Sequence, residues 1–353
     1  MLESCKIRRQ MKLRDEIARL KEELGRNVYI LGHHYIAQAV IDHCELRGDS
    51  LELARRVEGI RAPHIVFCGV HFMAESAALL ARPDQKTYIV AEEADCVMAR
   101  MVPAPLLDRV LARLCESGRR VVPLAYVNTS LSVKAVVGRF GGTVCTSANV
   151  DVMLRWALDQ GDQALFLPDQ HLGRNAAKGL GLAETDRHTL DIRNRGTQMD
   201  LAAARKARLL LWPGCCAVHV RFRPELVAAA RIAHPACRIA VHPECSPETV
   251  NAADAAGSTN FLIEYVAGSP AGSTLVIGTE ISLVERLARE QAGRCTVLPL
   301  ASSLCSHMAL TTEQRLLDCL RGIQAGTARA LAIPPEEAAP ARDALQRMLQ
   351  ACS

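Results

Sequence analysis

The sequence predicts an α/β fold made of three similar units with parallel sheets. Short runs rich in β-branched residues alternate with stretches of helical periodicity along the 353 residues, a pattern typical of parallel sheets with helices on both faces. The strand runs also fall into three sets, and an isolated cysteine follows the last run of each: Cys96, Cys216 and Cys305. An eight-fold barrel is the alternative, and it is disfavoured because the cysteines recur about once per set.

The elements can be assigned in chain order. The first set of strands contains NVYILGHH, HIVFCGV and KTYIVAE, and the second contains RVVPLAYVN, GTVCTSAN, ALFLPDQ and RLLLWPG. The third contains RIAVHPE, TLVIGTE and TVLPLAS, while segments such as SLELARRVEGI and PELVAAARIAHP supply helices. We therefore predict a first α/β unit with an N-terminal helix over 1–108, a second over 109–222, a third over 223–310 and C-terminal helices over 311–353.

Two segments depart from this rhythm. Residues 181–205 are polar and lack a strand signal, so we interpret them as a surface loop followed by a helix. Two helical segments follow Thr311, and Pro334 and Pro335 suit the start of the second one. We expect these C-terminal helices to have a covering or packing role.

Composition narrows the function classes. Aromatic residues make up only 4%, which argues against base stacking on nucleic acid, and the net charge of +4 comes from interspersed charges without a basic stripe. No apolar run reaches the roughly 20 residues that span a bilayer, and the charged N-terminus lacks a signal-peptide core. We expect a cytoplasmic protein that binds neither nucleic acid nor membranes and keeps its 14 cysteines reduced.

The spacing of Cys96, Cys216 and Cys305 favours a metal cluster over a structural zinc site. Zinc ligands usually come in closely spaced pairs, whereas these three thiols are isolated and each follows a strand run. One thiolate from each unit could hold a single four-iron cluster, and three protein ligands would leave one iron open to substrate. Cys68 and Cys145 lie in apolar strand runs and are interpreted as core residues.

Polar side chains gather where the predicted strands end. In open α/β sheets, ligands bind beyond the carboxyl ends of the strands, so three units with these ends turned inward would form one polar chamber lined by the three cysteines. A single histidine at such a position is at least as often structural as catalytic, and the prediction therefore depends on the whole collection. The clusters are His33-His34-Tyr35, His71, Glu92, Tyr126-Asn128-Thr129-Ser130, Thr146-Ser147, Asp169-Gln170-His171, His219, His242-Glu244 and Thr279-Glu280.

The chain resembles the quinolinate synthase family of bacterial and archaeal NAD biosynthesis. The matching runs, in the family's order over about residues 28–320, are GHHY, GDSLELA, GVHFMAESA, AYVNTS, CTSAN, FLPDQHLGR, WPGCCAVH, HPECSPE, AGSTNFLIEYV and VIGTEISLVERL. The resemblance implies three α/β/α units around a pseudo-threefold axis that enclose a central active site. It also implies a transferase-type enzyme that condenses iminoaspartate with dihydroxyacetone phosphate to give quinolinate, phosphate and two waters.

Site residues carry over from the resemblance position by position. It implies a [4Fe–4S] cluster with three cysteine ligands, Cys96, Cys216 and Cys305, whose open iron acts as a Lewis acid; the family spacing before His219 selects Cys216 over Cys215. The implied catalytic residues are Tyr35, Tyr126, His219 and Glu244, with His242 as a further proton-transfer candidate. The implied substrate-binding residues are His33, Ser50, Tyr126, Asn128, Ser147, His219, His242, Glu244, Ser258 and Thr259.

The sequence also departs from the family pattern. Cys96 lies in EADCVMA and Cys305 in LCSHM, where the family commonly has Gly-Cys-Ser and Cys-Pro-Asn-Met. These departures leave open a paralogue with an altered substrate. Two further alternatives are an iron–sulfur redox or oxygen sensor, for which the polar strand ends are unnecessary, and a zinc hydrolase, disfavoured by the lack of HExxH.

The sequence also leads to one expectation about a partner enzyme and one about a cofactor. The family's pathway implies a functional link to an aspartate oxidase or dehydrogenase that produces iminoaspartate. The implied reaction moves no hydride, and the chain has no GxGxxG or Walker A run, so we expect no nicotinamide cofactor.

Overall fold

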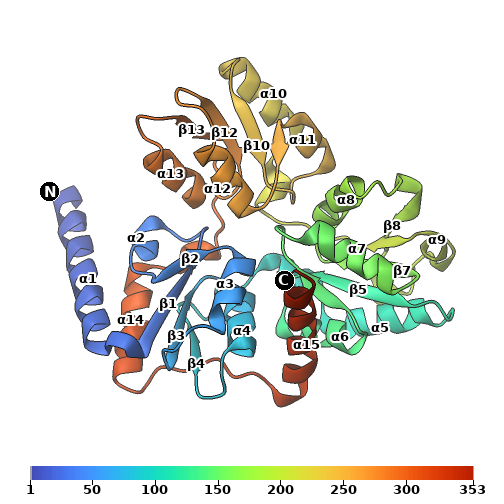
Figure 1. Cartoon of the computed structure of the whole chain (residues 1–353), viewed down its shortest axis with the longest axis horizontal. Helices are drawn as coiled ribbons and strands as arrows, with labels where there is room; N and C mark the ends of the chain where they lie inside the picture. The colour runs from blue at the N-terminus through green and yellow to red at the C-terminus, as the bar shows by residue number, and fades with distance from the viewer. Residues whose placement is uncertain (1, 353) are drawn as a thin grey trace. The chain divides into compact units, whose positions relative to one another are not determined.

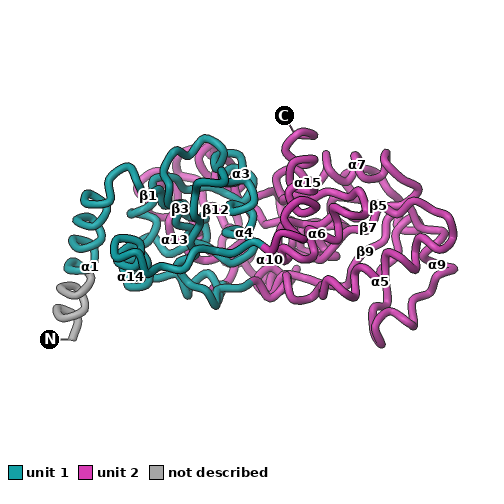
Figure 2. Tube along the Cα trace, turned by 90° about the horizontal axis from the view of Figure 1, so that it is seen from below, with its two compact units in different colours: residues 1–95, 305–333 teal, residues 96–304, 334–353 magenta. Residues whose placement is uncertain are grey.

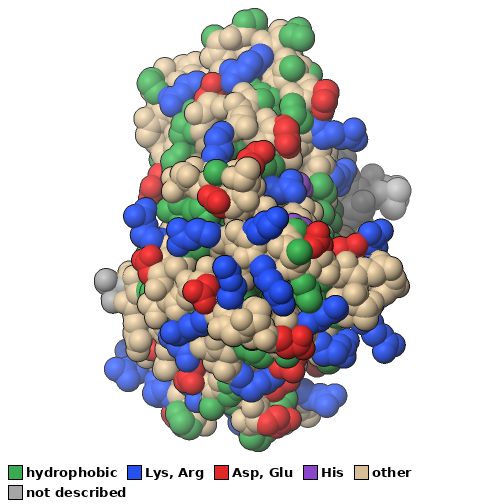
Figure 3. Space-filling view, turned by 90° about the vertical axis from the view of Figure 1, so that its right-hand side faces the viewer, with side chains coloured by type: hydrophobic (Ala, Val, Ile, Leu, Met, Phe, Trp, Pro, Cys, Tyr) green, Lys and Arg blue, Asp and Glu red, His purple; other side chains and the backbone are tan. Residues whose placement is uncertain are grey.

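The computed structural model describes residues 2–352, with side chains from residue 11 onward, and within them the chain forms three parallel sheets. By compactness the chain divides into two units (Figure 2). Unit 1 contains residues 1–95 and 305–333, and unit 2 contains residues 96–304 and 334–353. On the face drawn in Figure 3, Lys and Arg side chains are interspersed with Asp and Glu.

Unit 1 is built on one four-stranded parallel sheet with the order β2-β1-β3-β4 (Figure 1). The N-terminal helix α1 packs against α14 from the C-terminal part of the chain. The strands are β1 (Val28–His33), β2 (Leu46–Gly48), β3 (His64–Cys68) and β4 (Lys86–Ile89), and the helices are α1 (Leu2–Leu24), α2 (Gln38–Ile41), α3 (Ser50–Val57), α4 (His71–Leu80) and α14 (Glu313–Gln324).

Unit 2 contains the other two sheets. The first has the order β6-β5-β7-β9-β8 and the second β11-β10-β12-β13. The first comprises β5 (Val121–Tyr126), β6 (Thr143–Cys145), β7 (Gln163–Leu167), β8 (Arg187–Thr189) and β9 (Leu209–Leu211), with helices α5 (Ala104–Cys115), α6 (Leu131–Arg139), α7 (Val150–Gln160), α8 (Gln170–Gly179) and α9 (Leu201–Lys206). The second comprises β10 (Arg238–Val241), β11 (Ala255–Ala256), β12 (Thr274–Gly278) and β13 (Thr296–Pro299), with helices α10 (Pro224–Ala233), α11 (Pro247–Ala252), α12 (Thr259–Ala267) and α13 (Ile281–Glu290).

All three sheets repeat one topology, which confirms the predicted fold class. In each, the first strand in the chain pairs with the second on one side and the third on the other, and the last strand in the chain (β4, β9 or β13) pairs with the third on its outer side. The five-stranded sheet has one more strand, β8, at the edge beyond β9. Every registered pair is parallel, and the central strands are apolar and buried, as in sheets covered on both faces. The repetition places the strand ends of each sheet in equivalent positions.

The cysteines Cys96, Cys216 and Cys305 follow this repetition. Each comes a few residues after the strand of its sheet that is last in the chain, that is after β4, β9 and β13. Each cysteine carbonyl then accepts a hydrogen bond from a backbone N–H three or four residues later. A short 3-10 turn follows in every case: η2 (Val97–Met101), η5 (His219–Arg221) and η6 (Met308–Leu310).

The interpretation of residues 181–205 as a loop plus helix is wrong in one respect. The segment ends in α9, but it also contains strand β8, which pairs in parallel with β9 at the edge of its sheet. The sequence Arg-His-Thr of β8 is short, polar and only half-buried, so it carries no strand signal. The segment is also held by side chains, because the Arg113 guanidinium donates to the carbonyl of Gly196 at 2.8 Å. Strands β2 and β11 also lie outside the predicted strand sets, and they have only three and two residues.

The two C-terminal helices belong to different units. Helix α14 is in unit 1, whereas α15 (Pro335–Ala351) is in unit 2 and packs against α6 and β6. A Cβ atom at Gly138 would lie 1.9 Å from the carbonyl oxygen of Pro340, so the close approach of α6 and α15 requires glycine there. The predicted boundaries at residues 108, 222 and 310 stay a prediction, and residue 108 lies inside α5. None of the described helices is long and apolar enough to cross a bilayer.

Candidate active site

The predicted site residues occupy repeated positions at the carboxyl ends of the strands. A serine follows the second strand of each sheet, namely Ser50, Ser147 and Ser258. A candidate cysteine follows the strand of each sheet that is last in the chain. The end of the first strand is followed, or formed, by two candidates in each sheet: His33 and Tyr35 for β1, Tyr126 and Asn128 for β5, and His242 and Glu244 for β10.

In unit 1, His33 and Tyr35 are in contact. Their ring centroids lie 4.8 Å apart with the planes at 83°. The backbone N–H of Tyr35 donates to Nδ1 of His33 at 3.2 Å, so Nδ1 is an acceptor and a neutral ring carries its proton on Nε2. Ser50 is the first residue of α3, whose N-cap Asp49 accepts from two backbone N–H groups. Cys305 is half-buried in this unit.

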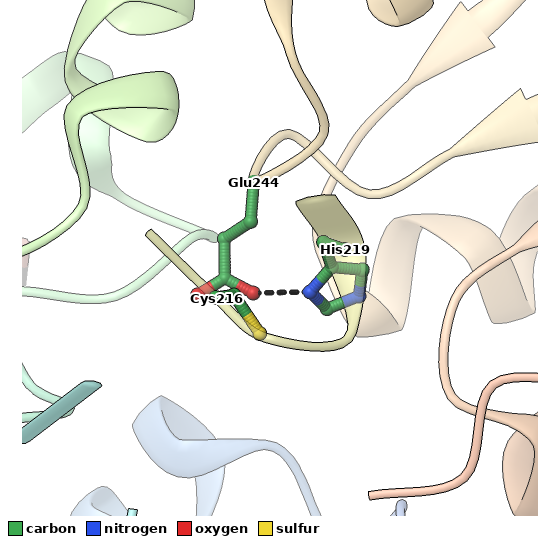
Figure 4. A group of neighbouring side chains, drawn as sticks. All are labelled: Cys216, His219 and Glu244. Atoms are coloured by element: carbon green, nitrogen blue, oxygen red, sulfur yellow. Dashed lines mark ion pairs between the residues drawn. The ribbon is translucent and has the colours of Figure 1, made fainter. Parts of the chain in front are cut away.

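In unit 2, His219 and Glu244 form a short, fully enclosed pair. Nδ1 of His219 lies 2.5 Å from Oε2 of Glu244, and the two side chains are 1% and 3% exposed (Figure 4). Burial raises the pKa of Glu244, but the charge and hydrogen bond of His219, together with His242 and the Tyr126 hydroxyl, outweigh burial and hold that pKa below its ordinary value. Glu244 is therefore an anion at neutral pH that orients the His219 ring.

The other nitrogen of His219 faces a hydroxyl. Nε2 lies 3.1 Å from Oγ1 of Thr279, which follows β12. In the tautomer with the proton on Nδ1, the atom that faces Glu244, Nε2 is the acceptor for the threonine hydroxyl. The chain Glu244–His219–Thr279 thus fixes the tautomer and orientation of the ring, as a carboxylate does for a general-base histidine.

His242 stacks on His219 and stays neutral. The two ring centroids are 4.3 Å apart and the planes differ by 18°. Burial and the neighbouring His219 lower the pKa of His242 to about 3, although Glu244 opposes them. Nδ1 of His242 accepts the backbone N–H of Glu244 at 3.3 Å, so the proton is on Nε2 and donates toward Oγ of Ser147 at 3.2 Å.

Cys216 joins this group and offers a ligand for a metal. Its thiol, a ring nitrogen of His219 and a carboxylate oxygen of Glu244 all lie within 4.8 Å of one another (Figure 4). Burial, and to a smaller extent the charge of Glu244, raise the pKa of the Cys216 thiol. The thiol of Cys96 is close enough to raise this pKa further. Unit 2 therefore brings two of the three candidate cysteines, Cys96 and Cys216, near each other.

The geometry favours a thiolate ligand over a Cys-His-Glu zinc site. Ligand atoms at about 2.0–2.1 Å from a tetrahedral zinc lie roughly 3.3 Å apart. The 2.5 Å separation of Nδ1 of His219 from Oε2 of Glu244 is much shorter than this spacing and is that of an ion pair. Cys216 is thus the member of the group that is available to a metal, and thiolates are the ligands that iron–sulfur clusters use.

Sequence reasoning assigned no role to two residues that the structure connects to this group. Thr279 contacts His219, and the fully buried Asp169 accepts the backbone N–H of Cys216 at 2.9 Å. Both were noted only as polar strand ends. Burial, and to a smaller extent the charge of Glu244, raise the pKa of Asp169. Three backbone hydrogen bonds to its carboxylate lower this pKa but do not outweigh burial. The N-cap position of Asp169, directly after an apolar run, was the available signal for a fixed carboxyl group.

The remaining predicted residues of unit 2 also lie at strand ends. Asn128 is half-buried beyond β5. Ser258 is the N-cap of α12 and accepts from the N–H of Phe261 at 3.3 Å, and Thr259 is the first residue of that helix. Their place in the site stays a prediction.

Comparisons with known proteins agree with this picture. A family model described as "Quinolinate synthetase A protein" matches residues 15–350. The chain is 41% identical to a quinolinate synthase from Streptomyces coelicolor, covering 93% of this chain and 86% of the relative. It is 40% identical to quinolinate synthases from Herpetosiphon aurantiacus (96% and 92% covered) and Corynebacterium glutamicum (96% and 87% covered).

Proposed function

The chain belongs to the quinolinate synthetase A family of enzymes, and on that premise we propose that it condenses iminoaspartate with dihydroxyacetone phosphate to quinolinate, phosphate and two waters. The observation that supports this most is the buried Glu244–His219 pair beside the thiol of Cys216. A condensation with two dehydrations needs several proton transfers near neutral pH, and an oriented histidine is the side chain best suited to them.

We propose that Cys96, Cys216 and Cys305 bind a [4Fe–4S] cluster. The fit is supported by their equivalent places after the last strand of each sheet in the chain and by the proximity of Cys96 to Cys216. When bound by three thiolates, such a cluster supplies a Lewis-acidic iron. Metal binding would require deprotonation of the Cys216 thiol, whose pKa burial raises, and thus would release a proton.

We propose that the side chains around His219 have different acid–base roles, because their surroundings favour different protonation states. His219 would accept and return protons at Nε2, the atom that faces Thr279, while Glu244 stabilises the protonated ring through Nδ1. His242, with a pKa of about 3, would act as a neutral donor through Nε2. The phenol groups of Tyr126 and Tyr35 are proposed as further acid–base groups.

Both proposed substrates are small anions, so their carboxylate and phosphate groups need hydrogen-bond donors. Hydroxyl, amide and imidazole N–H groups supply donors without fixed charge. We propose that the substrate-binding residues are His33, Ser50, Tyr126, Asn128, Ser147, His219, His242, Glu244, Ser258 and Thr259, among which the anionic Glu244 orients His219 and donates no hydrogen bond itself. We further propose that the protein acts in the cytoplasm in NAD biosynthesis, and that an aspartate oxidase or dehydrogenase supplies the iminoaspartate.

Anaerobic purification followed by metal and product analysis tests this proposal. We expect about four irons and four sulfides per chain, and quinolinate formation when iminoaspartate is generated in the presence of dihydroxyacetone phosphate. The proximity of Cys216, His219 and Glu244 makes a mononuclear zinc enzyme the second candidate. One zinc per chain would favour it and overturn the cluster, whereas a full cluster without quinolinate would point to a paralogue with another substrate.

A further inference from the structure

Asp169 is a fully buried carboxyl group that does more than cap a helix. It follows β7 and is the N-cap of α8, where Oδ1 accepts from the N–H groups of His171 at 2.8 Å and Leu172 at 2.9 Å. Such capping satisfies backbone donors that the first helical turn leaves open. One oxygen of the carboxyl group is enough for this task.

The second oxygen of Asp169 holds the loop that carries Cys216. Oδ2 accepts the backbone N–H of Cys216 at 2.9 Å. Two backbone bonds reinforce the junction, from the N–H of Gly214 to the carbonyl of Pro168 at 3.0 Å and from the N–H of Gln170 to the carbonyl of Gly214 at 2.9 Å. Since residues 212–218 belong to neither helix nor strand, these contacts tie the loop to the end of β7.

We propose that Asp169 is a positioning residue for Cys216, fixing the backbone from which this thiol reaches the metal. The inference extends the proposed function, since it takes Cys216 as a ligand. Groups that hydrogen-bond to the shell of metal ligands commonly change metal affinity by roughly 10- to 100-fold when they are replaced. Asp169 is fully buried, so its bond to Cys216 is shielded from competing water.

Two substitutions of Asp169 distinguish its capping of α8 from its positioning of Cys216. In Asp169→Asn the amide can present an acceptor either to α8 or to Cys216, and its NH2 group then faces a backbone donor at the other end. In Asp169→Ser the hydroxyl keeps a good N-cap acceptor, but the oxygen that reaches Cys216 is absent. Asp200→Asn is the matched control, because Oδ1 of Asp200 caps α9 through two N–H groups at 3.0 and 2.9 Å.

The first measurement uses the full chain without metal, so it does not depend on the proposed function. Iodoacetamide labelling and hydrogen exchange, followed by peptide mass spectrometry, report the mobility of Cys216. We expect at least about tenfold faster labelling of Cys216 and faster exchange of its backbone amide in Asp169→Asn and Asp169→Ser, since neither side chain keeps an acceptor for both α8 and the N–H of Cys216. Labelling of Cys115 should be unchanged, and Asp200→Asn should behave as wild type throughout.

The second measurement follows release of iron to a chelator from the anaerobically purified protein. We expect release roughly 10- to 100-fold faster in both Asp169 variants. Absence of iron from the wild-type protein would contradict the proposed function. The labelling of Cys216 would still decide whether Asp169 positions it, because that measurement uses the chain without metal. Unchanged Cys216 labelling and iron release in folded Asp169→Ser overturn the inference, and so does failure of both Asp169 variants to fold, which would show that the residue is needed for α8 itself.

Discussion

Nδ1 of His219 lies 2.5 Å from Oε2 of Glu244, and both side chains are almost fully enclosed by protein. The contact is an ion pair, in which the carboxylate orients the imidazole ring. The two residues come from segments on either side of α10, so the pair also joins the Cys216 loop to the end of β10. Its removal therefore provides the most direct test of the acid–base proposal.

We predict that Glu244→Gln lowers turnover by at least about 100-fold, the usual scale for one acid–base unit, while the iron content per chain is retained. Glutamine keeps the size of the side chain but cannot stabilise a protonated His219. The matched control is Glu313→Gln, because Glu313 also forms a buried pair with a histidine, His43, at 3.1 Å. Quinolinate formation and iron should be measured on the same preparations. Equal turnover in both variants would exclude Glu244 from the chemistry.

The pKa of His242 predicts how stability depends on pH. Its folded pKa of about 3 is below the ordinary value of 6.5. Between these values the unfolded chain binds a proton that the folded ring does not, so stability falls as pH decreases, by up to about 1.4 kcal/mol per pH unit. Above 6.5 the ring is neutral in both states and adds no pH dependence.

Urea unfolding at about pH 7.5, 6 and 5 checks this slope. The free energy of unfolding of His242→Gln should fall less steeply over this range than that of wild type. His234→Gln is the control, since His234 is exposed and should leave the slope unchanged. Parallel curves for wild type and His242→Gln would contradict the prediction.

Replacement of the candidate cysteine ligands should lower iron content and abolish activity. We expect this for Cys96→Ala, Cys216→Ala and Cys305→Ala, because two remaining thiolates hold a four-iron cluster poorly. Cys68→Ala, Cys215→Ala and Cys245→Ala should retain iron, although the buried Cys68 and Cys245 contribute to packing. Loss of iron in Cys215→Ala with full loading in Cys216→Ala would show that the adjacent cysteine is the ligand.

Much of this fold is accessible from sequence because its central strands are apolar on both faces. Runs such as VVPLAY in β5 are fully buried, and their continuous apolar composition predicts a strand directly from the sequence. The strands that sequence reasoning missed, β2, β8 and β11, have two or three residues and are not fully buried. They are set by pairing with a neighbour, which is a tertiary property, and their own composition carries little signal.

The site shows the same limit. The motifs HPE and CCAVH point to Glu244 and His219, but their 2.5 Å approach follows from the packing of segments around α10. Asp169 escaped assignment because an aspartate at a helix N-cap is common and its second hydrogen-bond partner lies 47 residues away. A side chain that caps a helix with one oxygen and makes a long-range contact with the other cannot be recognised from local pattern alone.

The presence of strand β8 changes the result that we expect from replacing residues 181–205. Replacing them with a short Gly/Ser linker should still leave the chemistry largely intact, because loop length itself costs little free energy. The replacement also removes β8, however, and exposes the edge of β9, so we expect lower stability. Urea unfolding and quinolinate formation distinguish the two effects. A variant that folds and holds iron but has no turnover would show that the segment forms part of the site.

The last prediction concerns Tyr35, whose ring packs edge-on against His33 at 4.8 Å in unit 1. Phenylalanine preserves that contact and removes only the hydroxyl. If this hydroxyl transfers a proton to or from substrate, Tyr35→Phe should keep the cluster and lose at least about 100-fold in turnover.

The alternative is that the Tyr35 hydroxyl only satisfies a hydrogen bond in the fold, and then the variant would lose about 1 kcal/mol of stability and turn over normally. Tyr29→Phe is the control, because Tyr29 is a half-buried tyrosine in β1, the same strand that leads to His33. Quinolinate formation, iron content and urea unfolding on one preparation of each variant decide between the two roles. Near-normal turnover of Tyr35→Phe at full iron loading would remove Tyr35 from the mechanism and leave the acid–base work to the Glu244–His219 pair.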